Sequence, residues 1–213
     1  KLAKGKYILL LNNDTKVERD FLSKLVDRIE NNSSIGVIQP KIFLMDKPGY
    51  LDNAGTFITK TGFLRHWGYM QKDGPEFNQS REIFSAKGAC MLTRRDVIDK
   101  IGLFDDDFFN YFEESDFCWR VWLAGYSIMY VPSSHIYHKV GFTSKRQNQS
   151  LVYYHSLKNM LAAQIKNLEL KNLIQITPTF LLIIISLSIY YIVRLRFREF
   201  AMIWKAILWN LTH

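Results

Sequence analysis

The chain has 213 residues, of which 48% are hydrophobic and 23% charged, and its formal net charge is +8. This composition is typical of a folded chain and excludes a disordered or low-complexity protein. The two cysteines, Cys90 and Cys118, lie far apart and outside any Cys-x-x-Cys motif. They exclude a disulfide scaffold and a zinc ribbon, and they are typical of a reducing compartment.

The excess positive charge lies in the C-terminal third. The first 138 residues balance basic against acidic side chains, whereas Glu169 and Glu199 are the only acidic residues in 139–213. A nucleic-acid-binding protein usually carries its charge over the folded face, while here lysines and arginines flank an apolar segment. We therefore exclude nucleic acid as a partner and expect contact with anionic membrane lipids.

The N-terminal region begins with the pattern of an α/β unit. The apolar run 7–11 ends abruptly in polar residues, which predicts a strand buried on both faces of a parallel sheet. Helical spacing over 21–29 and a second apolar run, 35–38, stopped by Pro40, predict a strand–helix–strand crossover. Because a buried parallel strand needs neighbours on both sides, we expect the first strands of this domain to precede Lys1.

The later elements of this region are marked by periodicity and by turn residues. They are irregular loops and short antiparallel pieces over 51–80, helices over 94–101 and 114–124 that end at Gly102 and Gly125, and a strand over 126–131 that Pro132 ends. Together they predict that residues 1–145 form an α/β body with a Rossmann-like, mainly parallel sheet.

The C-terminal region has the pattern of a membrane anchor. The segment 174–194 is uncharged up to Arg194, and at about 1.5 Å per residue its helix would cross a bilayer core of about 30 Å. The alternative is a buried core helix. Before it, residues 146–173 predict an amphipathic juxtamembrane helix on the membrane surface, and residues 195–213 predict a basic interfacial tail.

Three clusters of polar residues are candidates for chemistry. The first, Asn12-Asn13-Asp14, follows a predicted strand directly. Ligands of α/β sheets bind beyond the carboxyl ends of strands, and one carboxylate together with substrate phosphates can hold Mg²⁺. The same residues also form a good turn or helix cap, so this cluster alone leaves both interpretations open.

The second cluster, residues 104–116, interleaves carboxylates with aromatic side chains. Burial of carboxylates among aromatic rings raises their pKa toward that of a general base. Glu113 or Asp116 could pair with Arg120 on one helix face. The alternative is a capped helix start with solvated acids.

The third cluster contains His138, which follows the last predicted strand of the body. A lone histidine is usually structural, but paired in space with Asp14 it could complete a metal site.

With these elements in order, the chain resembles a family 2 glycosyltransferase of the GT-A fold, close to its rhamnosyltransferase-like members. The resemblance rests on 5–15 (the strand that leads into the DxD-type motif), 35–40 (the next strand), 88–95 (the pocket lining), 102–120 (the acceptor-base region) and 138–144 (a late metal-ligand loop). It implies a GT-A catalytic part that lacks its first strands and is followed by interfacial and transmembrane helices.

The resemblance also implies a role for each matching residue. A divalent cation, Mg²⁺ or Mn²⁺, would be bound by Asp14 and His138, with Asn12, Asn13 and Gly88 beside the donor. Glu114 would deprotonate the acceptor, Glu113 and Asp116 would orient it, and Arg120 would hold these carboxylates. The chain departs from the family pattern in having one carboxylate in Asn-Asn-Asp and Glu114 where Asp is common.

The function implied is inverting transfer of a sugar from a nucleotide-sugar donor, such as dTDP-rhamnose, to a cell-surface glycan or lipid-linked acceptor. The catalytic part would lie on the cytoplasmic face of a membrane, by expectation the bacterial inner membrane. Two alternatives remain: an inactive, membrane-tethered GT-A scaffold, and a fragment of a processive polysaccharide synthase. The second is disfavoured because no Gln-x-x-Arg-Trp sequence precedes the apolar segment.

Overall fold

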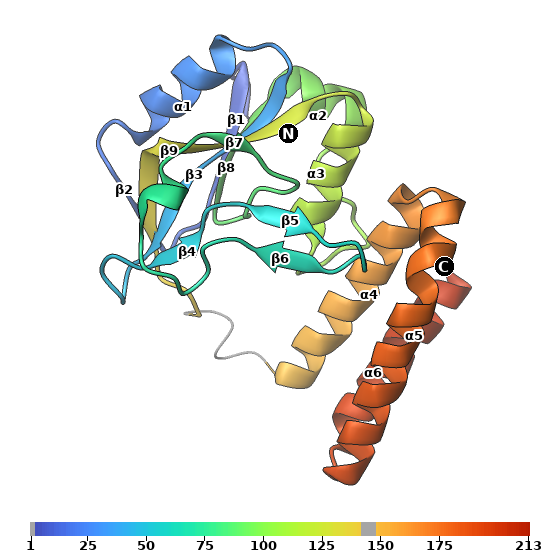
Figure 1. The fold of residues 1–213 in the computed structure, drawn as a ribbon. Helices are drawn as coiled ribbons and strands as arrows, with labels where there is room; N and C mark the ends of the chain where they lie inside the picture. Colours follow the sequence, from blue (N-terminus) through green and yellow to red (C-terminus); the bar gives the residue numbers. More distant parts are fainter. Residues whose placement is uncertain (1–2, 142–147) are drawn as a thin grey trace.

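The computed structural model describes residues 3–141 and 148–213, which form an α/β body followed by three helices (Figure 1). The body is built on one sheet with the order β1 (Tyr7–Leu11), β8 (Cys90–Arg94), β3 (Ile35–Leu44), β9 (Ser127–His138) and β2 (Thr15–Val17). Two short strands extend this sheet, since β4 (Leu51–Asn53) pairs with β3 and β7 (Arg81–Glu82) pairs with β9.

The sheet is mixed. Its two longest strands, β3 and β9, are parallel, and β8 runs antiparallel to both β1 and β3. Consequently β1, β3 and β9 share one direction, as the predicted strand–helix–strand unit requires. The prediction of a mainly parallel sheet holds only for these three strands, because the shorter strands β2, β4, β7 and β8 run the other way.

Strand β1 differs from its prediction. In the described part of the chain it pairs only with β8, antiparallel, and its side chains are half-buried or exposed rather than buried on both faces. Its apolar run therefore packs partly against the core on both faces, since Leu10 contacts one core cluster and Leu9 the other.

Neither Pro40 nor Pro132 ends a strand. The pairing of β3 with β9 is irregular where both prolines lie: Pro40 faces Val131, but the next residue of β3 faces His135. A proline is tolerated inside a sheet at such a bulge, where a ladder hydrogen bond is already lost. Strand β9 therefore continues to His138, which lies opposite Thr15 of β2.

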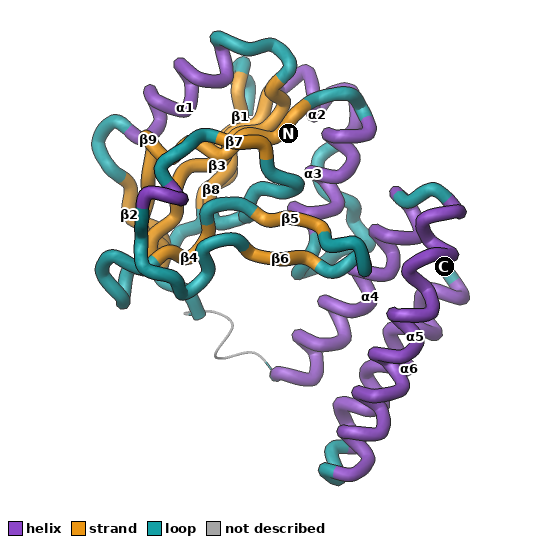
Figure 2. Tube along the Cα trace, viewed as in Figure 1, coloured by secondary structure: helices purple, strands orange, loops and turns teal. Residues whose placement is uncertain are grey.

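Helices cover the sheet on both faces (Figure 2). On one face, α1 (Phe21–Glu30) buries Phe21, Leu25 and Ile29 in a cluster with the apolar side chains of β3. On the other, α3 (Glu113–Leu123) packs against the core formed by β3, β8 and β9, beside α2 (Arg95–Ile101). The predicted ends of α2 and α3 are confirmed: Gly102 and Gly125 follow them, both with positive φ.

The segment 51–80 forms short antiparallel pieces and loops, as predicted. Beside β4 it contains a hairpin of β5 (Thr56–Ile58) and β6 (Leu64–His66) and the single-turn helix η1 (Pro75–Phe77). Its aromatic side chains fold back onto the body, since Trp67 contacts Phe77 and Tyr130. These contacts hold the hairpin against the body, and the hairpin lies near the C-terminal helices (Figure 1).

The C-terminal region consists of α4 (Gln149–Asn167), α5 (Leu170–Val193) and α6 (Phe197–Thr212). Helix α5 starts before the predicted boundary at residue 174. The apolar face of α4, which was predicted to lie on a membrane surface, is covered by the other two helices. Met160 packs in one cluster with Phe180 and Ile184 of α5 and Ile203 of α6. Helix α4 therefore packs along α6, and α5 packs beside α6 (Figure 1). Side chains of all three helices form one apolar cluster.

Helix α5 has the length and composition to cross a membrane. It has 24 residues and a mean hydropathy of 2.1 over its most apolar stretch, of which 22% is buried within the chain. Membrane insertion of this helix stays a prediction.

Candidate active site

The end of strand β9 brings His138 to Asp14. Pairing of Thr15 with His138 places the two side chains at one edge of the sheet, and the His138 Nε2 atom lies 3.3 Å from Asp14 Oδ1. The backbone amide of Lys139 also donates to the Asp14 carbonyl. The predicted meeting of these two residues, remote in sequence, is therefore present in the structure.

The opposite ring nitrogen of His138 is held by Asp52. The distance from Nδ1 to Asp52 Oδ2 is 2.8 Å, and Asp52, on β4, has no exposed surface. The Lys87 ammonium lies 2.6 Å from its other oxygen. Burial tends to raise the pKa of Asp52, but the hydrogen bond from His138 and the charge of Lys87 outweigh burial and lower it.

Sequence reasoning missed Asp52, since it lies in the segment read as loops. No sequence signal marked it, because the stretch has no periodicity; the burial of Leu51, Asp52 and Ala54 is visible only in the structure. Such a carboxylate must find partners, because an unpaired buried charge is costly.

The chain's own side chains fit a divalent cation only in part. Over residues 3–141 and 148–213, no cluster of three or more His, Cys, Asp or Glu side chains is arranged to hold a metal. The pair Asp14 and His138 fits nonetheless: Asp14 Oδ1 is buried without a hydrogen-bond partner, and Nε2 of His138, whose other ring nitrogen contacts Asp52, lies 3.3 Å from it. A hard cation with two protein ligands completes its shell with phosphate and water oxygens.

Asn12, Asn13 and Gly88 lie at the same edge. The Asn12 amide donates to the carbonyl of Ala89, where β1 ends beside the start of β8, and the side chains of Asn12 and Asn13 are exposed. The remaining part of the predicted metal-ligand loop, including Thr143 and Ser144, lies outside the described residues.

The segment Lys87-Gly88 connects this edge to the glutamates of α3. The side chain of Lys87 pairs with Asp52, and the Gly88 backbone amide donates to the Glu114 carboxylate. A Cβ atom at position 88 would meet Glu114 at 3.7 Å, so the two residues are in van der Waals contact distance. The buried Asp52 and the half-buried Glu114 are thus linked through two consecutive residues.

Glu113 and Glu114 line one cavity, of about 310 Å³, which we call the carboxylate cavity. Its other lining residues are Leu64, His66, Asn110, Tyr111, Phe112, Ser115, Ser156 and Met160. Burial, with the charge of Glu114 beside it, raises the pKa of Glu113 to about 7. Burial also raises the pKa of Glu114, against the opposing hydrogen bonds from backbone amides. One oxygen of Glu113 is buried without a partner.

A strained turn leads into these glutamates. Tyr111 and Phe112 both adopt left-handed backbone conformations, with φ of 69° and 72°. Such conformations are costly for residues with side chains and cluster at functional sites. The turn is held from α4: Asn159 Nδ2 donates to the carbonyls of Asn110 and Tyr111, at 2.9 and 2.6 Å.

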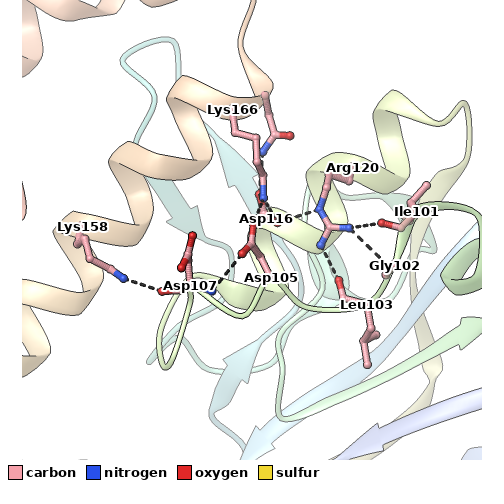
Figure 3. A network of polar contacts seen from close by, with 10 residues as sticks. Ile101, Gly102, Leu103, Asp105, Asp107, Asp116, Arg120, Lys158 and Lys166 are labelled. Atoms are coloured by element: carbon pink, nitrogen blue, oxygen red, sulfur yellow. Dashed lines mark hydrogen bonds and ion pairs between the residues drawn. The ribbon is translucent and has the colours of Figure 1, made fainter. Parts of the chain in front are cut away.

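Asp116 is engaged elsewhere (Figure 3). It is fully buried, and its oxygens accept from Arg120, Lys166 and Asn167, each at 2.9 Å. The predicted pairing with Arg120 is confirmed, but no oxygen of Asp116 is left to orient an acceptor. One helical turn separates Arg120 from Asp116, which brings the two side chains together. The guanidinium also donates to the carbonyls of Ile101 and Leu103. We therefore assign Asp116 and Arg120 a structural part.

The same network fixes α4 to the acidic segment. The Lys166 ammonium lies 2.7 Å from Asp105, and Lys158, which sequence analysis placed on a membrane surface, is buried and donates to the carbonyl of Asp107 (Figure 3). In turn, Asn210 of α6 donates to the carbonyl of Lys158. The C-terminal helices thus support the loop that leads into α3 and Glu113.

The fold of this chain is shared with solved structures of other proteins. The crystal structure of GalNAc-T7 with UDP, GalNAc and Mn²⁺ superposes with a TM-score of 0.55, at 15% identity, over 75% of this chain and 31% of that one. The model of the family described as Glycosyl transferase family group 2 matches residues 7–212, and the chain belongs to this family.

Curated relatives match over shorter stretches. The O-antigen biosynthesis protein RfbC of Myxococcus xanthus is 30% identical over 115 residues, which are 51% of this chain and 9% of that protein. The N-acetylglucosaminyl-diphospho-decaprenol L-rhamnosyltransferase of Mycobacterium tuberculosis is 35% identical over 69 residues, 32% of this chain and 22% of the relative. The chain thus spans less than a quarter of either relative.

Proposed function

We propose that the chain acts in an inverting glycosyltransferase, which moves a sugar from a nucleotide-sugar donor to a glycan or lipid-linked acceptor. The observation that carries the proposal is the contact of Asp14 with His138, with Asp52 behind the ring. A carboxylate and an imidazole nitrogen thus meet where a strand of the sheet ends. In α/β proteins this is where ligands bind.

Residues at this edge hold the donor. The negative charge of the departing nucleoside diphosphate would be offset by a divalent cation, Mg²⁺ or Mn²⁺, bound at Asp14 and His138. Asn12 and Asn13 offer exposed amide groups beside it. Gly88 leaves room between this edge and Glu114, because no side chain stands there.

Glu114 takes the proton of the acceptor hydroxyl. A base works best with a pKa near the working pH, and burial raises the pKa of this carboxyl. The acceptor oxygen attacks the anomeric carbon as the bond to the diphosphate breaks, so one displacement inverts the configuration. Glu113 lines the same cavity and keeps a free oxygen for the acceptor.

We further propose rhamnose, carried by dTDP, as the sugar and the cytoplasmic face of a membrane as the location. The name of the mycobacterial relative, an L-rhamnosyltransferase, supports the sugar. The apolar helix α5, with basic residues at both ends, supports the membrane.

Incubation of the full-length protein with a panel of nucleotide sugars tests this proposal. We expect release of nucleoside diphosphate from one donor class, its loss with a chelator, and an inverted anomeric centre in the product by NMR. If no donor is turned over with or without added Mn²⁺, an inactive scaffold is the better description. A retained configuration would contradict the single displacement.

A further inference from the structure

Gln39 is a fully buried amide in the middle of strand β3, between Ile38 and Pro40. A buried amide is costly unless its oxygen and its nitrogen both find partners. Here both do, since Oε1 accepts from the backbone amide of Lys87 at 2.6 Å and Nε2 donates to Oδ1 of Asn53 at 2.9 Å. One side chain of β3 thus joins strand β4 to the loop that precedes β8.

The direction of the Gln39 amide follows from its partners. A backbone N–H can only donate, so the Lys87 amide faces the oxygen of Gln39. Asn53 Oδ1 also accepts from the backbone amide of Gly55, at 2.6 Å, so the nitrogen of Gln39 faces Asn53. The two backbone amides therefore fix this network in one arrangement, which requires a donor and an acceptor on the same side chain at position 39.

Gln39 fixes the ion pair that lies behind His138. Asn53 follows Asp52 directly, and the Lys87 ammonium lies 2.6 Å from Asp52 Oδ1. The other oxygen of Asp52 lies 2.8 Å from Nδ1 of His138. Because Gln39 is bonded to both segments that carry this pair, it sets the separation of the carboxylate and the ammonium, and with it the place of the imidazole.

The same contact holds the segment that reaches Glu114. The Gly88 amide, one residue after that of Lys87, donates to the Glu114 carboxylate. Both amides belong to the loop between β7 and β8, and both are bound by side chains of other elements, Gln39 of β3 and Glu114 of α3. A displacement of Lys87 would therefore move the Gly88 amide away from Glu114.

We propose that Gln39 is a positioning residue of the candidate active site. Its amide holds the segment Lys87-Gly88 so that the support of His138 and the amide that faces Glu114 keep a fixed separation. Since Gln39 has no exposed surface, it acts through these residues and not on a substrate. The inference rests on the proposed function for the roles of His138 and Glu114, whose alignment it assigns to one buried side chain.

Gln39→Met tests the proposal in the full-length protein, because methionine is an adaptable side chain without the amide. Gln164→Met is the matched control. Gln164 is also buried, and its Nε2 donates to the carbonyl of Gly62 at 2.8 Å, which joins α4 to the hairpin of β5 and β6. Two properties of the folded protein are measured: hydrogen exchange of the Lys87 and Gly88 amides by NMR, and Mn²⁺ affinity by electron paramagnetic resonance.

We expect Gln39→Met to speed the exchange of both amides at least about tenfold, because each loses its fixed acceptor. We also expect it to weaken Mn²⁺ binding about tenfold, as loss of a partner behind a metal ligand does. Gln164→Met should change neither property, although it too loses a buried hydrogen bond. Unchanged exchange or unchanged Mn²⁺ affinity in Gln39→Met overturns the proposal, and so does an equal change in both variants, which would mark a purely structural role.

The wild-type chain provides a second measurement, which decides the matter even if Gln39→Met does not fold. Its Lys87 amide should exchange as slowly as the amides of β8, and exchange at the rate of an exposed loop overturns the proposal. A wild-type chain that binds no Mn²⁺ would refute the cation site of the proposed function, while the exchange rates still decide the part played by Gln39. Donor turnover together with fast exchange of the Lys87 amide would do the reverse.

Discussion

The Nδ1 atom of His138 lies 2.8 Å from Oδ2 of Asp52, a carboxylate with no exposed surface. An ionised carboxylate can only accept a hydrogen bond, so Nδ1 donates, and Nε2 is the nitrogen that faces Asp14. Metal-binding histidines are commonly oriented in this way by a carboxylate behind the ring. Asp52 therefore sets the direction of the His138 ring.

Replacement of Asp52 by Asn is expected to weaken Mn²⁺ binding. The amide loses the charge that orients the imidazole, and loss of such a partner typically costs about 10–100-fold in metal affinity. A titration of Mn²⁺ followed by electron paramagnetic resonance measures this without catalysis. The exposed Asp99→Asn is the matched control and should bind like the wild type. Equal affinity in Asp52→Asn would refute the orienting role.

Replacement of Asn159 by Ala is expected to lower kcat more than it changes KM. The variant loses two hydrogen bonds to the strained turn before Glu113, each worth about 1 kcal/mol. We expect a loss of about 2 kcal/mol in the free energy of unfolding and at least a tenfold fall in kcat, because the turn aims both glutamates.

Steady-state kinetics over a range of pH separates this effect from simple destabilisation. A displaced glutamate shifts the acid limb of the rate profile, whereas a smaller folded fraction lowers the whole profile evenly. The exposed Asn172→Ala serves as control. A uniformly lowered profile in Asn159→Ala would show that the residue only stabilises the fold.

Replacement of Asp116 by Ala is expected to destabilise the chain strongly. The variant leaves Arg120 and Lys166 without their buried partner, and breaking a buried ion pair costs about 3–5 kcal/mol. Glu30→Ala, which removes the exposed pair with Lys6, should cost far less, because solvent screens such a pair. Denaturant unfolding of both variants checks this. Similar small losses would mean that the network contributes nothing beyond a surface pair.

Glu113 is expected to make the chain less stable as the pH rises. Its folded pKa of about 7 exceeds the ordinary 4.5, so the folded state binds more protons between these values and loses stability across this window. Glu113→Gln removes the effect and should gain about 1–2 kcal/mol on the wild type between pH 4.5 and 8, a discounted figure since the side chain is partly exposed.

Unfolding free energies at both pH values measure this gain. Glu82→Gln, at an exposed position of β7, is the control and should show no such trend. A pH-independent difference between Glu113→Gln and the wild type would contradict the raised pKa.

The sequence allowed the meeting of Asp14 and His138 to be predicted, since both follow strands of one sheet. It misplaced the ends of β3 and β9, because Pro40 and Pro132 usually stop strands and only the paired structure reveals a bulge that accommodates both. Asp52 could not be found, since a buried acid within irregular loops leaves no periodic signal.

The surroundings of α4 could not be predicted from the sequence for a similar reason. An apolar stripe that includes Met160 predicts burial but does not say whether lipid or protein covers it, and the structure covers it with α5 and α6. Lys158 and Asn159 are polar, so the sequence predicts that they face solvent, although both are buried. Only the position of the loop 105–112 reveals their partners.

The most direct test of the account measures donor turnover and Mn²⁺ binding together in three variants of the full-length protein. Asp14→Asn and His138→Ala should each lose Mn²⁺ affinity and donor turnover by at least 100-fold. Glu114→Gln should keep Mn²⁺ affinity within about twofold and lose transfer to the acceptor by a similar factor. Wild-type turnover in all three variants would contradict the assignment of this site to sugar transfer.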